Sequence, residues 1–334
     1  MNKKSLTAVG LISGGLDSIL AAKILKDLNV NIVGIHFHIP WGCASKNKAI
    51  ELAQTIEIPL KIFELNESFI EIIKNPKYGI GSGMNPCVDC KIYFLTEAAK
   101  YMKEINADFI FTGEVLGQRP MSQLKNSLRQ IEKASGLKGY LLRPLCAQLL
   151  EPTFPEQQGL INRTQLLAIN GRGRKQQIAL AKKYHILNYP QPAGGCLLTD
   201  KNFSRRLKDA FHHKEDNFST IKFLPIGRYF RINKNFKAIL GRNQNENIAL
   251  IKNACDEDII MELPDKLGPT LILKGADPSQ DVLSLCAGLI QKFSKHKNSL
   301  TPQKMIYWKA QTPEHKKNIH AIILSNEAIK KIQL

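Results

Sequence analysis

The sequence lacks long apolar runs and shows no secretory leader. No apolar stretch approaches the roughly 18–20 residues that a membrane-spanning helix needs, and the short apolar run near the N-terminus ends at a glycine turn. We therefore predict a cytoplasmic protein without a membrane partner. In that reducing compartment the seven cysteines are expected to be thiols, metal ligands or redox groups rather than a disulfide framework.

Acidic residues are also scarce. The 29 Asp and Glu residues face 47 Lys and Arg residues, which leaves a formal net charge of +18. Residues 157–199 contain neither Asp nor Glu. This excess of cations indicates a polyanionic partner, because each phosphate that Lys or Arg neutralises releases condensed counterions. A solvated basic surface is the alternative explanation.

The first third of the chain alternates apolar strands with amphipathic helices. This order indicates a parallel sheet covered on both faces, with ligands at the carboxyl ends of its strands. We predict the α/β class, with a Rossmann-like parallel sheet in residues 1–210 and a smaller α+β domain in residues 220–334. In the first domain the strands are expected at Ala8–Ile12, Asn31–Ile39, Leu60–Leu65 and Asp108–Gly113, and the helices at Ser18–Leu28, Lys46–Ile56 and Lys91–Ile105.

A glycine-rich loop, S-G-G-L-D-S at residues 13–18, follows the first strand and opens the first helix. Glycines let the backbone approach a ligand closely, and the N–H groups at a helix N-terminus favour an anion. The loop is not a Walker loop, since no Gly-Lys-Ser/Thr follows, and it lacks the dinucleotide G-x-G-x-x-G spacing. The pattern therefore predicts a phosphate site, and the alternative is a glycine turn that only caps the helix.

This loop resembles the PP-loop of the N-type ATP pyrophosphatases, which have an adenine nucleotide alpha hydrolase-like fold. The resemblance implies that ATP and Mg²⁺ are cofactors and that pyrophosphate leaves when ATP adenylates a substrate. It implies a catalytic role for Asp17 in positioning magnesium. ATP contacts are implied for Ser13, Gly14, Gly15, Asp17 and Ser18, and His36 and Phe37 would lie beside the adenine unless they only pack in the core.

A second segment narrows the resemblance. The strings T-G-E-V-L-G-Q (112–118), S-Q (122–123) and L-R-P-L (142–145) resemble the catalytic domain of the tRNA 4-thiouridine synthetases over about residues 5–150. Polar side chains just after a strand end also lie where a ligand should bind. We expect ATP contacts from Thr112, Gly113 and Gln118 and RNA contacts from Arg119, Gln123 and Arg143, with loop and helix-cap hydrogen bonding as the alternative.

Three cysteines form a candidate site. Cys87 and Cys90 form a C-x-x-C before a helix, and Cys196 follows two glycines. By themselves they fit a redox pair, part of a zinc site or three-thiolate ligation. The set resembles that of the tRNA 2-thiouridylases and the iron–sulfur-dependent tRNA thiolases. That resemblance implies catalytic cysteines that either hold a 4Fe-4S cluster, the first choice here, or carry a persulfide; structural zinc ranks last.

Two basic regions are expected to contact RNA. The segment G-R-G-R-K-Q-Q at residues 171–177 opens an acid-free helix, and arginine forks bind phosphate in bidentate fashion. Here Arg172, Arg174 and Lys175 are the expected contacts, unless they form a solvated helix face. Near the C-terminus, G-R-N at 241–243 resembles the opening of the NFACT-type RNA-binding domain, which implies RNA contact by Arg242 or, alternatively, a packing module.

These features predict a tRNA sulfurtransferase that adenylates a uridine carbonyl and replaces its oxygen with sulfur. The product is 4-thiouridine or 2-thiouridine, because the flanking regions match neither synthetase family well. The expected partners are tRNA and a sulfur donor, either a cysteine desulfurase-derived persulfide or hydrosulfide, and the oligomeric state stays open, a homodimer included. The alternatives are a PP-loop enzyme acting on a small molecule and a non-catalytic RNA-binding protein.

Overall fold

The computed structural model describes residues 6–41, 46–190, 196–265 and 267–334. The chain divides into two compact units, Met1–Lys201 (unit 1) and Asn202–Leu334 (unit 2). The division therefore falls before residue 210, because helix α8 (Lys201–His212) belongs with the second unit. Among the described residues, no helix has both the length and the apolarity that crossing a membrane requires.

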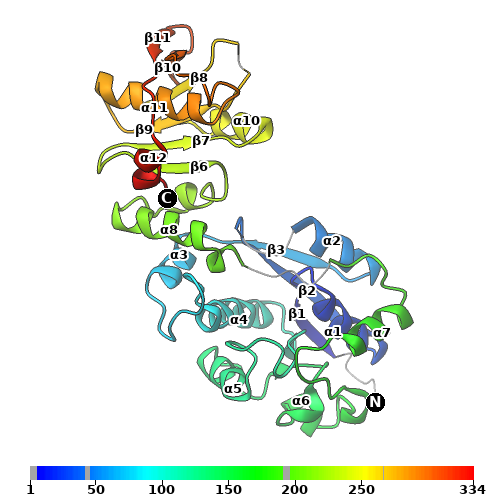
Figure 1. Cartoon of the computed structure of the whole chain (residues 1–334). Helices are drawn as coiled ribbons and strands as arrows, with labels where there is room; N and C mark the ends of the chain where they lie inside the picture. The colour runs from blue at the N-terminus through cyan, green and yellow to red at the C-terminus, as the bar shows by residue number, and fades with distance from the viewer. Residues whose placement is uncertain (1–5, 42–45, 191–195, 266) are drawn as a thin grey trace. The chain divides into compact units, whose positions relative to one another are not determined.

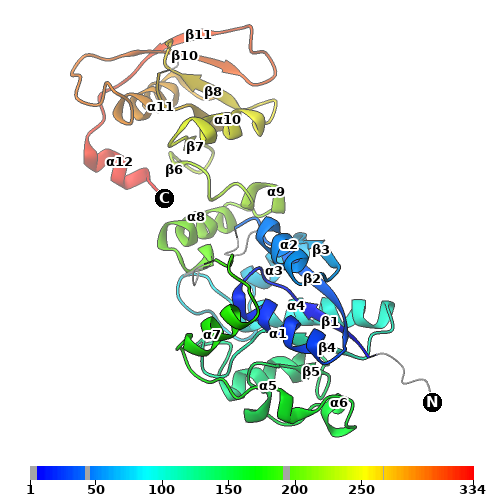
Figure 2. The same cartoon turned by 90° about the vertical axis from the view of Figure 1, so that its right-hand side faces the viewer.

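Unit 1 is built on a five-stranded parallel sheet in the order β3-β2-β1-β4-β5. The predicted parallel α/β sheet is therefore confirmed. Its strands and helices follow one another along the chain, as Figures 1 and 2 show. The strands are β1 (Thr7–Leu11), β2 (Asn31–His38), β3 (Leu60–Glu64), β4 (Phe109–Thr112) and β5 (Leu141–Leu142); the helices are α1 (Leu16–Asp27), α2 (Lys46–Thr55), α3 (Glu67–Lys74), α4 (Cys87–Glu104), α5 (Lys125–Ala134), α6 (Phe154–Gln157) and α7 (Lys175–Lys183).

Two apolar layers cover the sheet. Helices α1, α2 and α7 pack on one face, and α4 and α5 pack on the other (Figure 1). Neighbouring residues of β1 divide between the layers, with Ala8 in the first and Val9 in the second, as the two-residue period of a strand requires. Helix α4 begins four residues earlier than predicted, at Cys87, so Cys87 and Cys90 lie in its first turn.

Unit 2 contains a six-stranded antiparallel sheet in the order β11-β10-β8-β9-β7-β6. Its core joins one face of this sheet to α11 and α12. This confirms the smaller C-terminal α+β domain. Its elements are α8, α9 (Phe218–Ile221), β6 (Arg228–Arg231), β7 (Lys237–Leu240), α10 (Gln244–Lys252), β8 (Ile259–Glu262), β9 (Leu271–Lys274), α11 (Gln280–Lys292), β10 (Lys304–Lys309), β11 (Lys317–His320) and α12 (Asn326–Ile332).

Candidate functional site

The strand order of unit 1 determines where a ligand is expected. From β1 the chain proceeds to β2 and β3 on one side, and β4 lies on the other side of β1. The carboxyl ends of β1 and β4 therefore flank the point where the strand order reverses, which is where open α/β sheets bind ligands. The S-G-G-L-D-S loop follows β1, and Thr112–Gly113 ends β4.

The S-G-G-L-D-S loop turns sharply into α1. Gly14 has a φ of +79°, a conformation that favours glycine, and Gly15 is the N-cap of α1 in an extended conformation. Because Gly15 has no side chain to cap the helix, the N–H groups of the first turn of α1 are available to an anion. The Ser18 hydroxyl braces the loop: it donates to the Gly15 carbonyl at 2.8 Å and lies 3.3 Å from both the Ser13 N–H and the Ser13 hydroxyl.

Strand β4 lies directly against this loop through Gly113. A Cβ added at Gly113 would lie 2.4 Å from the carbonyl carbon of Asp17 and 2.4 Å from the Ser18 nitrogen. Only glycine allows this approach without moving the backbone of α1. The glycine predicted as an ATP contact therefore also determines how closely β4 approaches the loop. Its neighbour Thr112 is buried and donates to Glu114 at 3.1 Å.

Asp17 lies among polar groups from two distant segments. The Gln118 side chain hydrogen-bonds to it, Arg119 acts on its charge, and an Arg174 Nη2 lies 3.9 Å from its Oδ1. Burial raises the pKa of Asp17, and these three groups oppose that shift. Within the described parts of the chain, Asp17 Oδ1 is buried and has no hydrogen-bond partner.

The segment without Asp or Glu, residues 157–199, reaches this site at residues 170–174. The turn after β4 holds it in place beside Asp17. The Gly171 N–H donates to the Leu116 carbonyl at 2.8 Å, and Leu116 and Asn170 form a parallel bridge. Gly117 has a φ of +73°, and a Cβ there would lie 2.9 Å from Asn170 Oδ1. This packing places Arg174 beside Asp17, although the sequence predicted that Arg174 contacts RNA.

Two predicted RNA contacts are buried. Arg143 is 3% exposed; its guanidinium donates to Glu114 at 3.1 Å and to Glu132 at 3.2 Å. Burial favours the neutral form of Glu114, but the charges of Lys91 and Arg143 outweigh it and lower the pKa of this carboxyl. Gln123 is 4% exposed under the same turn. Both predictions are therefore corrected, because neither side chain presents a surface to RNA. The Arg143 side chain holds the turn after β4, whereas Gln123 contributes its backbone carbonyl, which accepts from the Gly117 N–H at 2.8 Å.

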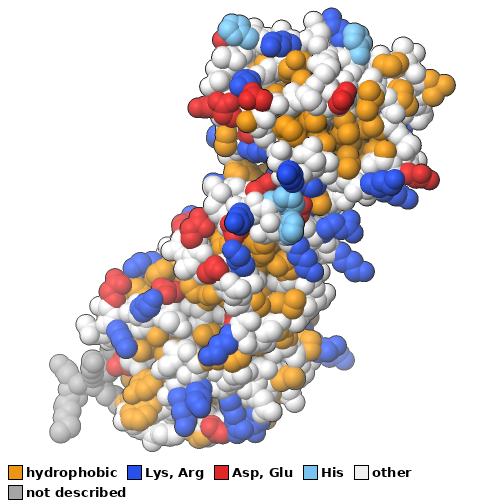
Figure 3. All heavy atoms as spheres, turned by 90° about the vertical axis from the view of Figure 1, so that its left-hand side faces the viewer, with side chains coloured by type: hydrophobic (Ala, Val, Ile, Leu, Met, Phe, Trp, Pro, Cys, Tyr) orange, Lys and Arg blue, Asp and Glu red, His pale blue; other side chains and the backbone are white. Residues whose placement is uncertain are grey.

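The other predicted RNA contacts differ in exposure. Arg174 is partly buried, whereas the other four side chains that were predicted to contact RNA are exposed. In the second unit, the Arg242 guanidinium also donates to Glu246. On the face drawn in Figure 3, Lys and Arg side chains are spread over both units rather than gathered in one patch. The four exposed cations are Arg119, Arg172, Lys175 and Arg242, and RNA contact by them stays a prediction.

His36 and Phe37, predicted beside the adenine, point to opposite faces of the sheet. Phe37 packs in an aromatic cluster, with ring centroids 4.7 Å from Phe94 and 5.2 Å from Phe63. It therefore adopts the alternative role, core packing. His36 is 2% exposed, and its Nδ1 lies 2.8 Å from the Ile12 carbonyl at the start of the loop. Burial lowers the pKa of His36, so the ring is neutral near pH 7.

The cysteine segments are tied together by a backbone hydrogen bond. The Met84 N–H, just before α4, donates to the Leu198 carbonyl at 2.8 Å, two residues after Cys196. Cys87, Cys90 and Cys196 are all half-buried, and Cys87 Sγ lies 3.1 Å from Asn85 Oδ1. Among the described residues, no three His, Cys, Asp or Glu side chains form a metal-binding group. Three thiols suit iron or zinc in their chemistry, but in the described residues they are not gathered into such a group.

Two further cysteines, Cys146 and Cys286, are buried away from this site. Cys43, together with Gly194 and Gly195 before Cys196, lies outside the described residues. Cys146 is buried and donates to the Glu114 carbonyl, and burial raises its pKa to about 11. Cys286 is buried in unit 2, where burial raises its pKa as well. These thiols stay protonated and have a packing role.

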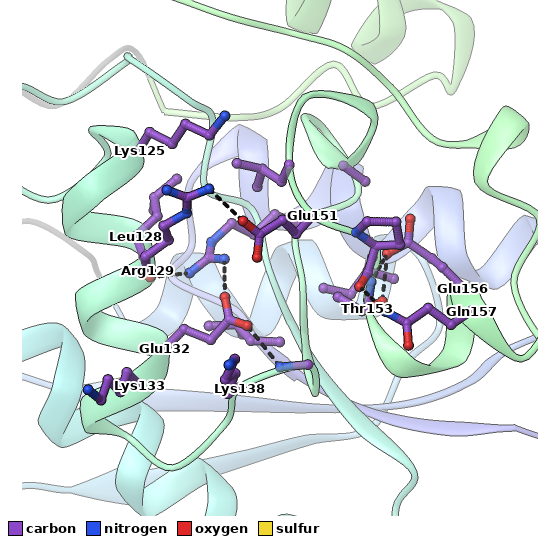
Figure 4. A pocket seen from close by; sticks show the side chains of 17 residues that line it. Lys125, Leu128, Arg129, Glu132, Lys133, Lys138, Glu151, Thr153, Glu156 and Gln157 are labelled. Atoms are coloured by element: carbon purple, nitrogen blue, oxygen red, sulfur yellow. Dashed lines mark hydrogen bonds and ion pairs between the residues drawn. The ribbon is translucent and has the colours of Figure 1, made fainter.

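A separate cavity of about 610 Å³ lies between α5 and the segment that contains α6 (Figure 4). Arg129 pairs with Glu151, and Glu132 pairs with Arg143, which also lines the cavity. It includes neither Asp17 nor any of the three cysteines. The cavity is therefore distinct from the site at the ends of β1 and β4.

Sequence reasoning missed one polar residue near the site. Gln177 lies on α7, one turn after Arg174, and is completely buried. Within the described chain, neither amide atom of Gln177 has a hydrogen-bond partner. A three-residue spacing from Arg174 puts both side chains on one helix face, and this spacing was the available signal.

Comparison with known families divides the chain as the structure does. Residues 4–149 match the family described as thiamine biosynthesis protein (ThiI), which includes the S-G-G-L-D-S loop, the Cys87–Cys90 pair and the turn after β4. Residues 227–332 match the NFACT protein RNA binding domain. Unit 1 thus contains a ThiI-family PP-loop domain, and unit 2 contains an NFACT-type RNA-binding domain.

The curated relatives include proteins named tRNA-specific 2-thiouridylase MnmA. The one from Lachnoclostridium phytofermentans is 23% identical over 241 residues, covering 65% of this chain and 64% of the relative. The one from Clostridioides difficile is 26% identical over 232 residues, covering 62% and 59%. The chain thus spans about three-fifths of the length of these relatives. A solved 4-thiouridine synthetase–RNA complex with bound ATP is 18% identical, covers 66% of this chain and 51% of that one, and has a TM-score of 0.38.

Proposed function

We propose that this protein thiolates tRNA in an ATP-dependent reaction. The proposal rests on the presence of a ThiI-family PP-loop domain and an NFACT-type RNA-binding domain in one chain. The observation that supports this most is the S-G-G-L-D-S loop at the strand-order reversal, where α1 offers uncapped N–H groups beside Asp17. The relatives named as tRNA thiouridylases and the RNA-binding domain favour tRNA over a small-molecule substrate.

The proposed first step is adenylation of a uridine. The carbonyl oxygen of the base attacks the α-phosphorus of ATP, and pyrophosphate leaves. The backbone N–H groups of residues 14–18 and the Ser13 hydroxyl would hold the phosphates at the N-terminus of α1. The base must leave its stack to reach this site.

Magnesium suits the Asp17 carboxylate. This ion is commonly held by one or two carboxylates together with substrate phosphates, so a single aspartate beside a phosphate loop is sufficient. The unpartnered Asp17 Oδ1 is consistent with a ligand at this position. When bound, the ion would neutralise the negative charge that develops on the departing pyrophosphate.

In the second step a sulfur nucleophile adds to the activated carbon, and AMP leaves with the former carbonyl oxygen. Where the nucleophile is the terminal sulfur of a cysteine persulfide, a second thiol of the set attacks the inner sulfur. The S–S bond to the transferred sulfur then breaks, the thiocarbonyl is released, and the two cysteines are left as a disulfide that an external thiol reduces. We assign sulfur delivery to Cys87, Cys90 and Cys196, whose segments the Met84–Leu198 hydrogen bond joins. A thiolate or persulfide is reactive near neutral pH. Whether these thiols carry a persulfide or assemble a 4Fe-4S cluster is decided by an anaerobic visible spectrum with iron and sulfide assays. A colourless, iron-free protein prepared anaerobically would exclude the cluster.

The decisive experiment measures pyrophosphate release by the full chain with ATP, magnesium and either tRNA or free uridine. We expect release only with tRNA, and it should not require a sulfur source. Nucleoside analysis of tRNA after reaction with sulfide or a cysteine desulfurase then distinguishes 4-thiouridine from 2-thiouridine. Pyrophosphate release that is independent of RNA would contradict the proposal and favour a small-molecule substrate.

A further inference from the structure

Helices α1 and α7 lie side by side with the same direction. At their beginnings Arg174 lies 3.9 Å from Asp17, and at their ends the Lys23 Nζ lies 5.4 Å from the centre of the Tyr184 ring. Tyr184 also hydrogen-bonds to Asp27. The two N-termini therefore meet beside the S-G-G-L-D-S loop, where both helix dipoles favour an anion.

Three side chains on these two helices or at their starts, two of them half-buried and one completely buried, have buried polar atoms without hydrogen-bond partners among the described residues. They are Asp17 through Oδ1, Arg174 through Nε, and Gln177 through both amide atoms. Gln177 is completely buried, so bulk water does not reach it. Buried polar groups are nearly always paired in folded proteins, so several unpaired groups in one place indicate a missing polar ligand.

The arrangement also indicates the charge of that ligand. The Arg174–Asp17 distance of 3.9 Å is too long for a hydrogen bond, so the arginine donors are not used up by the carboxylate. An arginine fork between two helix N-termini selects an anion with several oxygens. The S-G-G-L-D-S loop contains no lysine or arginine of its own, so a cation from another segment would complete its phosphate site.

We infer that Arg174 and Gln177 bind the leaving pyrophosphate portion of ATP, and that α7 is part of the nucleotide site rather than the RNA surface. The inference extends the proposed function and rests on it for the identity of the nucleotide. Residues 170–177 lie beyond the ThiI-family match, so the family does not supply this assignment. Exposed Arg172 and Lys175, on the same segment, stay available for RNA.

The test is equilibrium binding of ATP and of inorganic pyrophosphate, each with magnesium, to the full chain in the absence of RNA. We expect Arg174→Gln to weaken both at least tenfold, because a charge-assisted pair of hydrogen bonds is lost. Arg174→Lys keeps the positive charge but not the forked guanidinium. Its dissociation constants should lie between those of the wild type and of Arg174→Gln. Lys182→Gln is the matched control: it removes one exposed cation from the same helix and should leave both dissociation constants within twofold.

A second variant separates ligand binding from folding. Replacing Gln177 with the similarly sized Met removes polar atoms that are unpaired without a ligand. We expect Gln177→Met to keep or raise the thermal midpoint of the ligand-free protein while weakening ATP binding severalfold. A purely structural Gln177 would instead lower the midpoint and leave ATP affinity unchanged, which would contradict the inference.

Other outcomes would also overturn it. If Arg174→Gln binds ATP as tightly as Lys182→Gln, or if it weakens tRNA binding alone, Arg174 belongs to the RNA surface or to the fold. If Arg174→Gln does not fold, Arg174→Lys and Gln177→Met supply the same comparison. Failure of the proposed function is separate: a wild-type chain that no RNA stimulates would refute tRNA adenylation, while the nucleotide-binding comparison would still stand.

Discussion

The neighbouring strands β1 and β4 are each followed by a carboxylate beside an arginine, and the two pairs differ in how their hydrogen bonds are met. After β4, Arg143 is 3% exposed and donates to both Glu114 and Glu132. After β1, Arg174 is 3.9 Å from Asp17, and each has a buried atom without a partner among the described residues.

This difference separates a structural pair from a functional one. A fully buried pair that is joined by a direct hydrogen bond fixes a conformation, here the turn after β4. Glu114 Oε1 has no hydrogen-bond partner among the described residues, but the Lys91 ammonium lies 3.4 Å from it. The half-buried Asp17–Arg174 pair has no direct hydrogen bond, and its buried unmet atoms are costly in the free protein unless a ligand completes them. The two pairs therefore make opposite predictions for stability and for activity.

The largest effect is expected at the directly bonded, fully buried pair of Arg143 and Glu114. Arg143→Ala leaves the Glu114 charge buried with only Lys91 beside it and should lower the free energy of unfolding by about 3–5 kcal/mol. Denaturant unfolding measures this. Arg129→Ala breaks an exposed pair with Glu151 and should cost less than about 1 kcal/mol. Equal losses in the two variants would remove the distinction between the pairs.

The next effect is on activity at the Asp17–Arg174 pair, which has no direct hydrogen bond. Asp17→Asn should reduce tRNA-dependent pyrophosphate release by roughly 10²–10³-fold, because the carboxylate that we assign to magnesium is lost. Its thermal midpoint should stay near that of the wild type, since a costly buried charge is removed. Asp27→Asn, at the other end of α1, is the control and should retain activity. A destabilised but active Asp17→Asn protein would show that this pair is structural too.

A smaller effect is expected two residues from Arg174. Arg172 is exposed, so Arg172→Gln should weaken tRNA binding a few fold and reduce the salt slope of binding by about one. ATP binding should be unchanged. Titrations of tRNA at several salt concentrations test this. An unchanged slope would show that this end of the segment does not contact RNA phosphates.

The smallest effect concerns acid stability. The pKa of Glu114 is lowered in the folded protein, so the stability that its charge contributes is present above about pH 4.5, its usual pKa, and is lost as the pH falls through the folded value. Glu114→Gln should therefore show a shallower loss of stability in acid than the wild type. The free energy of unfolding is measured at several acidic pH values for both proteins. An identical loss of stability in the variant and the wild type would mean that Glu114 does not contribute to it.

The strand and helix pattern of unit 1 was largely predictable. Apolar runs predicted β1 to β4 within a few residues, because buried parallel strands need continuous apolar side chains. The short β5 was missed, since two residues carry no periodicity. The start of α4 was misplaced because the helix was expected to begin only after the C-x-x-C, at Lys91, whereas it begins at Cys87 directly after Pro86.

The site could be predicted only in part. The sequence by itself determined the S-G-G-L-D-S loop and its place after β1, because these depend on local backbone freedom and residue type. It singled out the three cysteines but left their chemistry open. Only the tertiary structure decided which arginine is buried. Arg143 and Arg174 look alike in sequence. Gly113 lets the end of β4 pack closely against α1, and Gly117 lets the following turn pack against Asn170. In the folded chain Arg174 therefore lies beside Asp17, and Arg143 is buried against Glu114.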